Sequence, residues 1–218
     1  MNKLKSFMSL ILDLILPKNI EETNIENMSE IDILNEVPEA NDIKNIHFKS
    51  LLQYRNKITR KAIWAIKYNK NQKLIRKFSV LLYEFILENT IDETAFNNFD
   101  NPLLIPIPMH KNNIKERGYN QSELIAKEIY KIDEGKNFEL TLDALLKEKE
   151  TPHQSTLKNK IERLKNLKDC FSANENKIKN RNVILIDDVI TTGTTMTEAS
   201  KTLRKAGAKK VIGFSIAH

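Results

Sequence analysis

Cysteine is almost absent from this chain of 218 residues, and the one present is Cys170. A single thiol cannot form a disulfide framework within the chain, and it cannot build a zinc site from several thiolates. The four histidines, His47, His110, His153 and His218, are scattered. The shortage therefore argues against disulfide-stabilised secreted folds, and we expect a cytoplasmic protein without bound zinc.

Long apolar runs are missing as well. A membrane-spanning helix needs about 20 consecutive apolar residues, and no stretch of the sequence approaches that length. The run Phe7–Leu16 follows two lysines, as the core of a signal peptide would, but Asp13 interrupts it and no small-residue cleavage site follows. We therefore predict an amphipathic helix at residues 1–17 that docks on the body of the protein or on another subunit, and no membrane span.

Positive charge is missing from one segment. Between Lys18 and Lys44 there are eight acids and no lysine or arginine, which is typical of a weakly ordered acidic linker. We assign residues 18–48 to this linker and residues 49–218 to the main domain. Because the whole chain still has a net charge of +6, the main domain is strongly basic. A basic domain suits phosphate-rich ligands such as nucleotides, pyrophosphate or nucleic acid.

The main domain alternates helical and extended patterns. Helices are predicted at Ile58–Lys70, at Leu74–Leu87, after the N-cap Asn120 through Ile129, and at Met196–Lys205. Apolar strands are predicted at Leu103–Ile107, Val183–Asp187 and Val211–Ile216, and a polar loop at Met109–Tyr119. Strand, loop, helix and strand at this spacing imply a right-handed crossover. The expected fold class is α/β, with a parallel sheet flanked by helices and a short helical N-terminal appendage.

Two adjacent acids, Asp187 and Asp188, end the most apolar of these strands. The carboxyl edge of a parallel sheet is where open α/β folds bind their ligands. Carboxylates there can accept hydrogen bonds from sugar hydroxyls and can stabilise positive charge on a sugar ring. The alternative is that the two acids only end a strand and cap a turn, but adjacent buried acids without a cation are costly.

A hydroxyl-rich turn follows the acids and leads into a helix. Its residues are Thr191, Thr192, Gly193, Thr194 and Thr195. Thr195 and Glu198 have the spacing of a capping box, which predicts that the helix begins there. Unpaired amides and the positive end of the helix dipole hold a phosphate well, and Gly193 lets the backbone approach it closely. The sequence therefore predicts a phosphate cradle one turn after the two acids.

This segment lacks the Gly-Lys-Ser/Thr ending of a P-loop and the spacing of a dinucleotide fingerprint. It resembles instead the ribose-phosphate motif of type I phosphoribosyltransferases. Further stretches narrow the resemblance to the ComF family. They are Ile11–Pro17, Tyr54-Arg55, Ala65–Tyr68, Ile105–Pro108, Arg117–Leu124, and Thr151–Ser155 with Leu157, Arg163 and Asn166. Such proteins usually carry a four-cysteine zinc ribbon after the opening helix, and here the acidic segment stands in its place.

The resemblance implies a type I phosphoribosyltransferase-like fold that binds 5-phosphoribosyl-1-pyrophosphate with Mg²⁺, and a link to DNA uptake in natural transformation. Asp187 and Asp188 are then the candidate catalytic residues, and they bind ribose phosphate together with the Thr191–Thr195 turn. Candidates on the pyrophosphate side are Arg117, because an arginine can grip phosphate with two hydrogen bonds, and with it Gly118 and Lys111. Gln154 and Arg163 are the candidates in a mobile loop at Thr151–Lys168.

Three functions are open at this point. The protein is an active transferase with an unidentified nitrogen acceptor, a non-enzymatic single-stranded-DNA-binding protein that acts with other competence proteins, or a ligand-sensing regulator. Purine salvage is disfavoured, because Thr191 stands where purine-salvage relatives carry an acid. For DNA we favour a basic face separate from the cradle, made by Arg55, Lys57, Arg60, Lys61 and Lys67. The aromatic pair Trp64 and Tyr68 is expected to belong to the core, with base stacking as the alternative.

Overall fold

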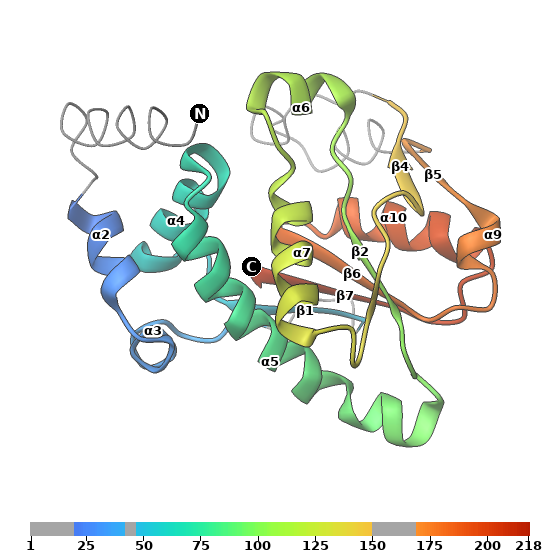
Figure 1. Ribbon diagram of the computed structural model, residues 1–218, viewed down its shortest axis with the longest axis horizontal. Helices are drawn as coiled ribbons and strands as arrows, with labels where there is room; N and C mark the ends of the chain where they lie inside the picture. Colours follow the sequence, from blue (N-terminus) through green and yellow to red (C-terminus); the bar gives the residue numbers. More distant parts are fainter. Residues whose placement is uncertain (1–19, 42–46, 150–168) are drawn as a thin grey trace.

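The computed structural model describes residues 20–41, 47–149 and 169–218 of the chain (Figure 1). The predicted helix of residues 1–17 and the loop residues Gln154 and Arg163 lie outside these ranges. The assignment of 1–17, 18–48 and 49–218 as separate units stays a prediction. Within the described ranges, no helix is long and apolar enough to cross a membrane.

A five-stranded sheet forms the centre of the fold, with the strand order β1-β7-β6-β2-β3. The strands are β1 Phe48–Leu52, β2 Leu103–Pro106, β3 Glu139–Leu140, β6 Val183–Val189 and β7 Val211–Ala217. Every neighbouring pair in this sheet is parallel, which confirms the predicted class. The strand β6, which carries the two acids, lies in the middle of the sheet, so its carboxyl end lies between those of β2 and β7.

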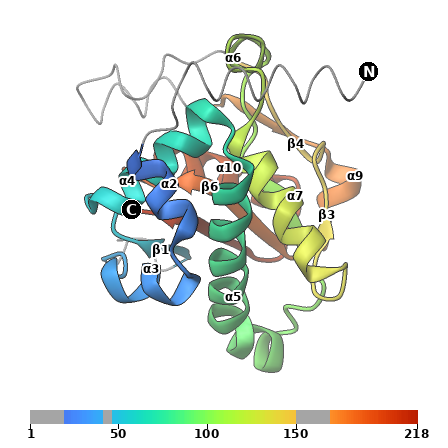
Figure 2. The same ribbon diagram turned by 60° about the vertical axis from the view of Figure 1, so that its left-hand side comes forward.

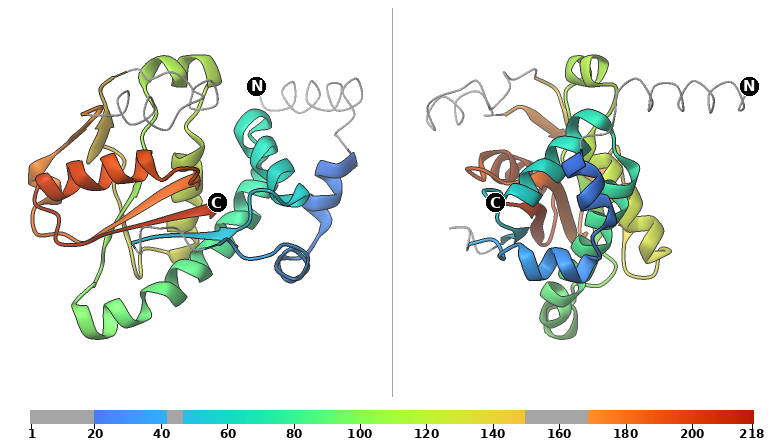
Figure 3. Two further views of the ribbon diagram at one scale, coloured as in Figure 1. Left: turned by 180° about the vertical axis from the view of Figure 1, so that it is seen from behind. Right: turned by 90° about the vertical axis from the view of Figure 1, so that its left-hand side faces the viewer.

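Helices cover both faces of the sheet. The helices α5 (Gln72–Asn97) and α7 (Gln121–Asp133) pack on one face, and α10 (Thr194–Lys205) lies across the other (Figure 3). Alternate residues of β6 supply the two cores. Ile184 and Ile186 belong to the cluster on the α5 side, whereas Val183 and Leu185 belong to the cluster that contains residues of α10. A strand buried on both faces reads as a continuous apolar run, as this one does.

Smaller elements lie outside the central sheet (Figure 1). The strands β4 (Leu145–Lys147) and β5 (Phe171–Ala173) form an antiparallel pair, and α9 (Glu175–Ile178) follows them. The helix α6 (Lys111–Arg117) occupies most of the segment predicted as a polar loop, so that prediction was wrong. His110 caps α6 by accepting a hydrogen bond from the amide of Asn112, and Gly118, at φ 84°, ends it.

The acidic segment is helical where the structure describes it, so a weakly ordered linker was the wrong prediction for residues 20–41. It forms α2 (Ile20–Asn27) and α3 (Glu30–Glu36), and Ser29 and Asp32 make a reciprocal capping box at the start of α3. Ile25 and Ile33 are buried in the core cluster of α5. The number of acids did not predict this packing, because composition does not show which face of a helix each apolar residue occupies.

The predicted helix Ile58–Lys70 is divided into two parts. An α-helix, α4 (Lys57–Trp64), runs into a π-helical turn, η1 (Ala65–Asn69), and Lys70 ends it at φ 50°. The helix α2 lies beside α4 and the start of α5 (Figure 2). Glu21 of α2 forms ion pairs with Lys57 at 2.5 Å and Lys61 at 2.8 Å. Two lysines of the predicted DNA-binding face therefore share one carboxylate within the protein.

Candidate functional site

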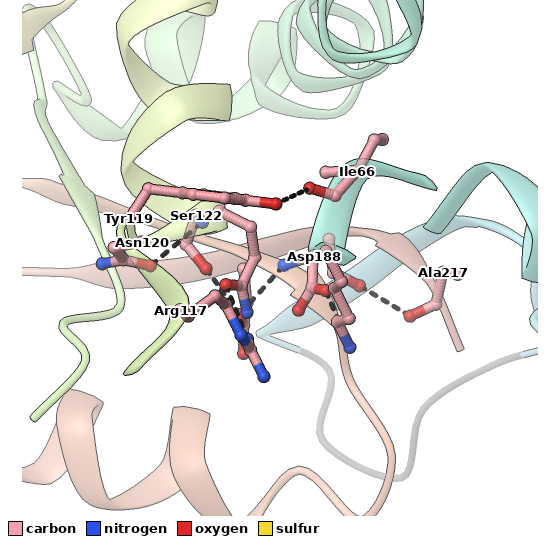
Figure 4. A network of polar contacts seen from close by, with 11 residues as sticks. Ile66, Arg117, Tyr119, Asn120, Ser122, Asp188 and Ala217 are labelled. Atoms are coloured by element: carbon pink, nitrogen blue, oxygen red, sulfur yellow. Dashed lines mark hydrogen bonds and ion pairs between the residues drawn. The ribbon is translucent and has the colours of Figure 1, made fainter. Parts of the chain in front are cut away.

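The carboxylate of Asp187 is held at the carboxyl end of β6 by Ser122 and Asp188, which Figure 4 labels. The hydroxyl of Ser122, at the start of α7, donates a hydrogen bond of 2.8 Å to its Oδ1 atom, and the amide of Asp188 donates one of 2.9 Å to the same atom. Burial and the neighbouring charge of Asp188 raise the pKa of Asp187 to about 7, against the lowering effect of the Ser122 hydrogen bond and Lys67. A carboxyl group whose pKa is raised by burial and a neighbouring charge is typical of functional sites.

The second acid, Asp188, is 4% exposed and pairs with a lysine. Lys67 Nζ, from the π-turn η1, lies 2.8 Å from Asp188 Oδ2. Burial alone would lower the pKa of Lys67, but the charge of Asp188 and its hydrogen bond outweigh that effect and raise the pKa. The prediction that Lys67 belongs to a DNA-binding face was wrong, because its ammonium group turns inward. It supplies the cation that two adjacent acids require.

The threonine-rich turn connects β6 to α10. Gly193, at φ 73°, is the N-cap residue, and α10 begins at Thr194. The predicted capping box of Thr195 and Glu198 is therefore not formed, because the left-handed glycine turns the chain into the helix without a side-chain cap. The hydroxyls of Thr192 and Thr194 lie 2.8 Å apart.

One small pocket unites most of the predicted ribose-phosphate residues. Asp187, Thr191, Gly193, Thr194 and Thr195 all line it. Thr192, also predicted, contacts Thr194 but is not part of the lining. An acid at the end of a strand thus faces the same small space as the first turn of α10, where helix amides and the helix dipole attract an anion.

The candidates on the pyrophosphate side are only partly brought together. Arg117 ends α6, and its guanidinium donates a hydrogen bond of 3.0 Å to Gln121, the neighbour of Ser122 in α7. Gly118 is exposed and follows directly. Lys111 is exposed at the opposite end of α6, about 9 Å from Arg117 along the helix axis. The structure therefore places Arg117 and Gly118 together and leaves Lys111 apart from them.

Sequence reasoning gave no role to two residues that hold the site in shape. Ser122 fixes Asp187, and Tyr119 links η1 to the segment between α6 and α7. The hydroxyl of Tyr119 donates to the carbonyl of Ile66 at 3.0 Å and accepts from the amide of Lys70 at 3.0 Å. The only sequence signal for either residue was its place in the stretch Arg117–Leu124 that resembles the ComF family.

The donor atoms fit Mg²⁺ held mainly by a substrate. In the part of the chain that the structure describes, no three histidine, cysteine, aspartate or glutamate side chains gather as a metal cage. Both hydrogen bonds to Asp187 use Oδ1, so Oδ2 can face the pocket that Asp187 lines. Magnesium in phosphate-binding sites is commonly held by one or two carboxylates and several phosphate oxygens, and Asp187 matches that donor set.

Sequence comparison finds a matching family model and similar proteins. The family model described as phosphoribosyl transferase domain matches residues 114–217. Competence protein F of Haemophilus influenzae is 37% identical over 117 residues, which cover 52% of this chain and 49% of that protein. Competence protein ComFC of Bacillus subtilis is 36% identical over 116 residues, which cover 52% of this chain and 43% of that protein.

Among solved structures, the glutamine phosphoribosylpyrophosphate amidotransferase from B. subtilis complexed with ADP and GMP is 18% identical, with a TM-score of 0.41. The match covers 71% of this chain and 30% of that one. The chain spans about half the length of the curated relatives it matches. By its sequence the chain is similar to the ComF competence proteins, and the matching domain together with the parallel sheet shows a type I phosphoribosyltransferase-like fold.

Proposed function

We propose that the carboxyl end of β6 binds 5-phosphoribosyl-1-pyrophosphate together with Mg²⁺, and that the protein transfers the phosphoribosyl group to a nitrogen acceptor. The observation that carries the proposal is the shared pocket of Asp187 and the first turn of α10. A ligand that joins a 5-phosphate to a sugar would put the phosphate at Gly193–Thr195 and the sugar hydroxyls at Asp187.

Each residue then has a defined task. The two carboxylates accept hydrogen bonds from the ribose hydroxyls and stabilise the positive charge that develops on the ring as the bond from C1 to pyrophosphate breaks. The bonding electron pair leaves with the pyrophosphate, which Arg117 would grip. Mg²⁺ would supply charge neutralisation to the departing group. Gln154 and Arg163 stay expectations for the loop that would cover the site.

Calorimetric titration with the ribose ligand and Mg²⁺ tests this proposal. We expect Asp187→Asn to weaken binding at least tenfold, because a hydrogen bond to a charged acceptor is worth about 1.5–3 kcal/mol. Asp187 is the better target of the two acids, since Asp188 is also needed to neutralise Lys67. Asp143→Asn is the matched control, because Asp143 is an exposed acid in the loop between β3 and β4. It pairs with Lys177 of α9. Equal affinity of a folded Asp187→Asn protein and the wild type would refute the site.

A second candidate function is binding of single-stranded DNA, and a basic cleft favours it. The cleft has a volume of about 490 Å³ and lies along the outer side of α10, beside the start of β1. Its lining residues are His47, Phe48, Thr197, Ser200, Lys201, Arg204 and Lys205. Lysines and arginines spaced along one helix suit a chain of backbone phosphates. The relatives' names connect those proteins with competence.

Fluorescence anisotropy of a labelled oligonucleotide at several salt concentrations tests this surface. The pair of changes Arg204→Ala and Lys205→Ala should lower both the affinity and the salt slope. Lys57→Ala with Lys61→Ala is the control pair, because both lysines are engaged by Glu21 and lie on α4, away from this cleft. If the changes at Lys57 and Lys61 lower the affinity and those at Arg204 and Lys205 do not, DNA binds on the face of α4 instead. Contacts with other competence proteins rest on the family resemblance, and a cytoplasmic location rests on the scarcity of cysteine; both stay predictions.

A further inference from the structure

The turn η1 separates an inward lysine from two outward aromatic side chains. Lys67, within the turn, reaches Asp188 at 2.8 Å. Trp64, directly before the turn, is 52% exposed and Tyr68 is 58% exposed, so the expectation that this aromatic pair belongs to the core was wrong. The π-helical form of the turn changes which residues share a face, so whatever causes that form also decides where Lys67 points.

The hydroxyl of Tyr119 is inserted into the backbone of this turn. In an α-helix the amide of Lys70 would donate to the carbonyl of Ile66, four residues earlier. Here the Tyr119 hydroxyl donates to that carbonyl at 3.0 Å (Figure 4), and it accepts from that amide at 3.0 Å. The Lys70 amide also donates to the carbonyl of Ala65, five residues earlier, which is the hydrogen bond of a π-turn. Insertion of a side chain between two helical hydrogen-bond partners distorts a helix locally, so Tyr119 accounts for the wide turn.

Tyr119 is anchored from the side of the central sheet. It precedes Asn120, which is 7% exposed and donates a hydrogen bond of 3.0 Å to the carbonyl of Ile107, the residue after β2. The side chain of Asn120 also accepts from the amide of Ser122 at the start of α7. Burial raises the pKa of the Tyr119 hydroxyl, so the hydroxyl keeps the proton that it donates. The tyrosine therefore brings a hydroxyl to the turn from a position that β2 and α7 define.

We propose that Tyr119 is a positioning residue, and that its hydroxyl keeps η1 in the wide form that directs the ammonium group of Lys67 onto Asp188. Its two hydrogen bonds lie on either side of Lys67 in the chain. Without the hydroxyl, the carbonyl of Ile66 and the amide of Lys70 can bond to each other, and the turn can close as an α-helix. Lys67 then turns with the backbone, and Asp188 is left as a buried acid without its cation. For its effect on the ligand, this inference rests on the proposed function.

Tyr119→Phe removes the hydroxyl and keeps the ring, and fluorescence tests its effect on the turn without any ligand. Trp64 is the single tryptophan of the chain and directly precedes η1. Its ring centroid lies 5.4 Å from that of Tyr68, inside the turn. We expect the emission maximum of Trp64 and its quenching by acrylamide to change in Tyr119→Phe, because closure of the turn moves the two rings relative to each other.

Tyr83→Phe is the matched control for this change. The Tyr83 hydroxyl also donates one hydrogen bond, to Asp133, and accepts one, from Asn137. These partners lie at the end of α7, whereas Tyr119 lies before its start. The control therefore loses the same two kinds of hydrogen bond away from η1, and the fluorescence of its tryptophan should stay that of the wild type.

A double-mutant cycle shows whether Tyr119 acts through Lys67. Tyr119→Phe should weaken binding of 5-phosphoribosyl-1-pyrophosphate with Mg²⁺ by about threefold to tenfold, the range that loss of one hydrogen bond gives. The affinity falls because Asp188, without its cation, adds negative charge beside a phosphorylated ligand. In the Lys67→Met background the same change should have an effect of less than about twofold, since the lysine that Tyr119 positions is gone.

The outcomes separate this inference from the proposed function. Unchanged Trp64 fluorescence in Tyr119→Phe, or equal losses of affinity in both backgrounds, would overturn the inference and leave the proposed function standing. Absence of ligand binding by the wild-type protein would overturn the proposed function. The same cycle measured by urea unfolding then decides the inference, because it needs no ligand: coupled losses of stability support it, and additive losses overturn it.

Discussion

Replacement of Lys67 by methionine tests the ion pair between Lys67 and Asp188 in the candidate site. Methionine keeps most of the length and apolar volume of the lysine stem but removes the charge. Asp188 would then be a carboxylate, with a side chain 5% exposed, that has lost its ion-pair partner. Removal of one partner from a fully buried pair costs about 3–5 kcal/mol, whereas an exposed pair contributes about 0–1 kcal/mol.

The Lys67 side chain is 24% exposed, which places this pair between those limits. We therefore expect a loss of about 2–3 kcal/mol in the free energy of unfolding. For a chain of this size the loss corresponds to a fall of about 5–10 °C in Tm. Urea unfolding followed by circular dichroism, together with calorimetry, measures both quantities at neutral pH.

A double-mutant cycle shows whether the charge is responsible. Asp188→Asn in the Lys67→Met background should recover at least about 1 kcal/mol relative to the sum of the single changes, because no unpaired ion is left. Lys57→Met is the matched control, since Lys57 pairs with Glu21 and its side chain is 70% exposed. The reasoning fails if Lys67→Met is as stable as the control, or if the two single changes are additive.

Four further changes follow from particular contacts. Gly213→Ala should cost about 1–3 kcal/mol in urea unfolding, because its Cβ atom would lie 2.9 Å from the ring of Phe48; a neutral change would contradict the packing. Cys170 should react with a maleimide far more slowly in the native protein than in urea, because burial raises the pKa of its thiol. Elemental analysis should find no zinc, and one zinc per chain would contradict the ligand count. Glu22→Ala should expose residues 20–36 to proteolysis, because Asn69 and Asn71 both donate to that carboxylate.

The unit of β6, the threonine turn and α10 was predictable because its signals are local. Four apolar residues from Val183 to Ile186 indicate a buried strand, and the acids and the glycine follow without interruption. The start of α10 was placed too late, because Thr195 and Glu198 imitate a capping box. A glycine in the left-handed conformation can precede a helix without any side-chain cap, and such a helix start cannot be predicted from the spacing of polar residues.

The partner of Asp188 could not be predicted from local signals. Lys67 lies far from Asp188 in the chain, and on a helical wheel it looks like one more surface lysine. The π-turn that directs it inward is not encoded by any residue pattern in η1, because such turns depend on tertiary packing. The same turn exposes Tyr68, so one irregular segment explains two wrong predictions, the DNA-binding role of Lys67 and the burial of the aromatic pair.

The acidity of the N-terminal segment has its physical reason in the helices that it contacts. Hydrogen bonds from Lys57 and Lys61 lower the pKa of Glu21 to about 2, and Glu22 accepts hydrogen bonds from Asn69 and Asn71. Carboxylates of α2 thus tie together α4, η1 and the start of α5, in the part of the chain where ComF-like sequences usually carry a zinc ribbon. The same contacts engage Lys57 and Lys61 of α4. The cleft along α10 gathers Lys201, Arg204 and Lys205, and this is where we expect a nucleic-acid strand to bind.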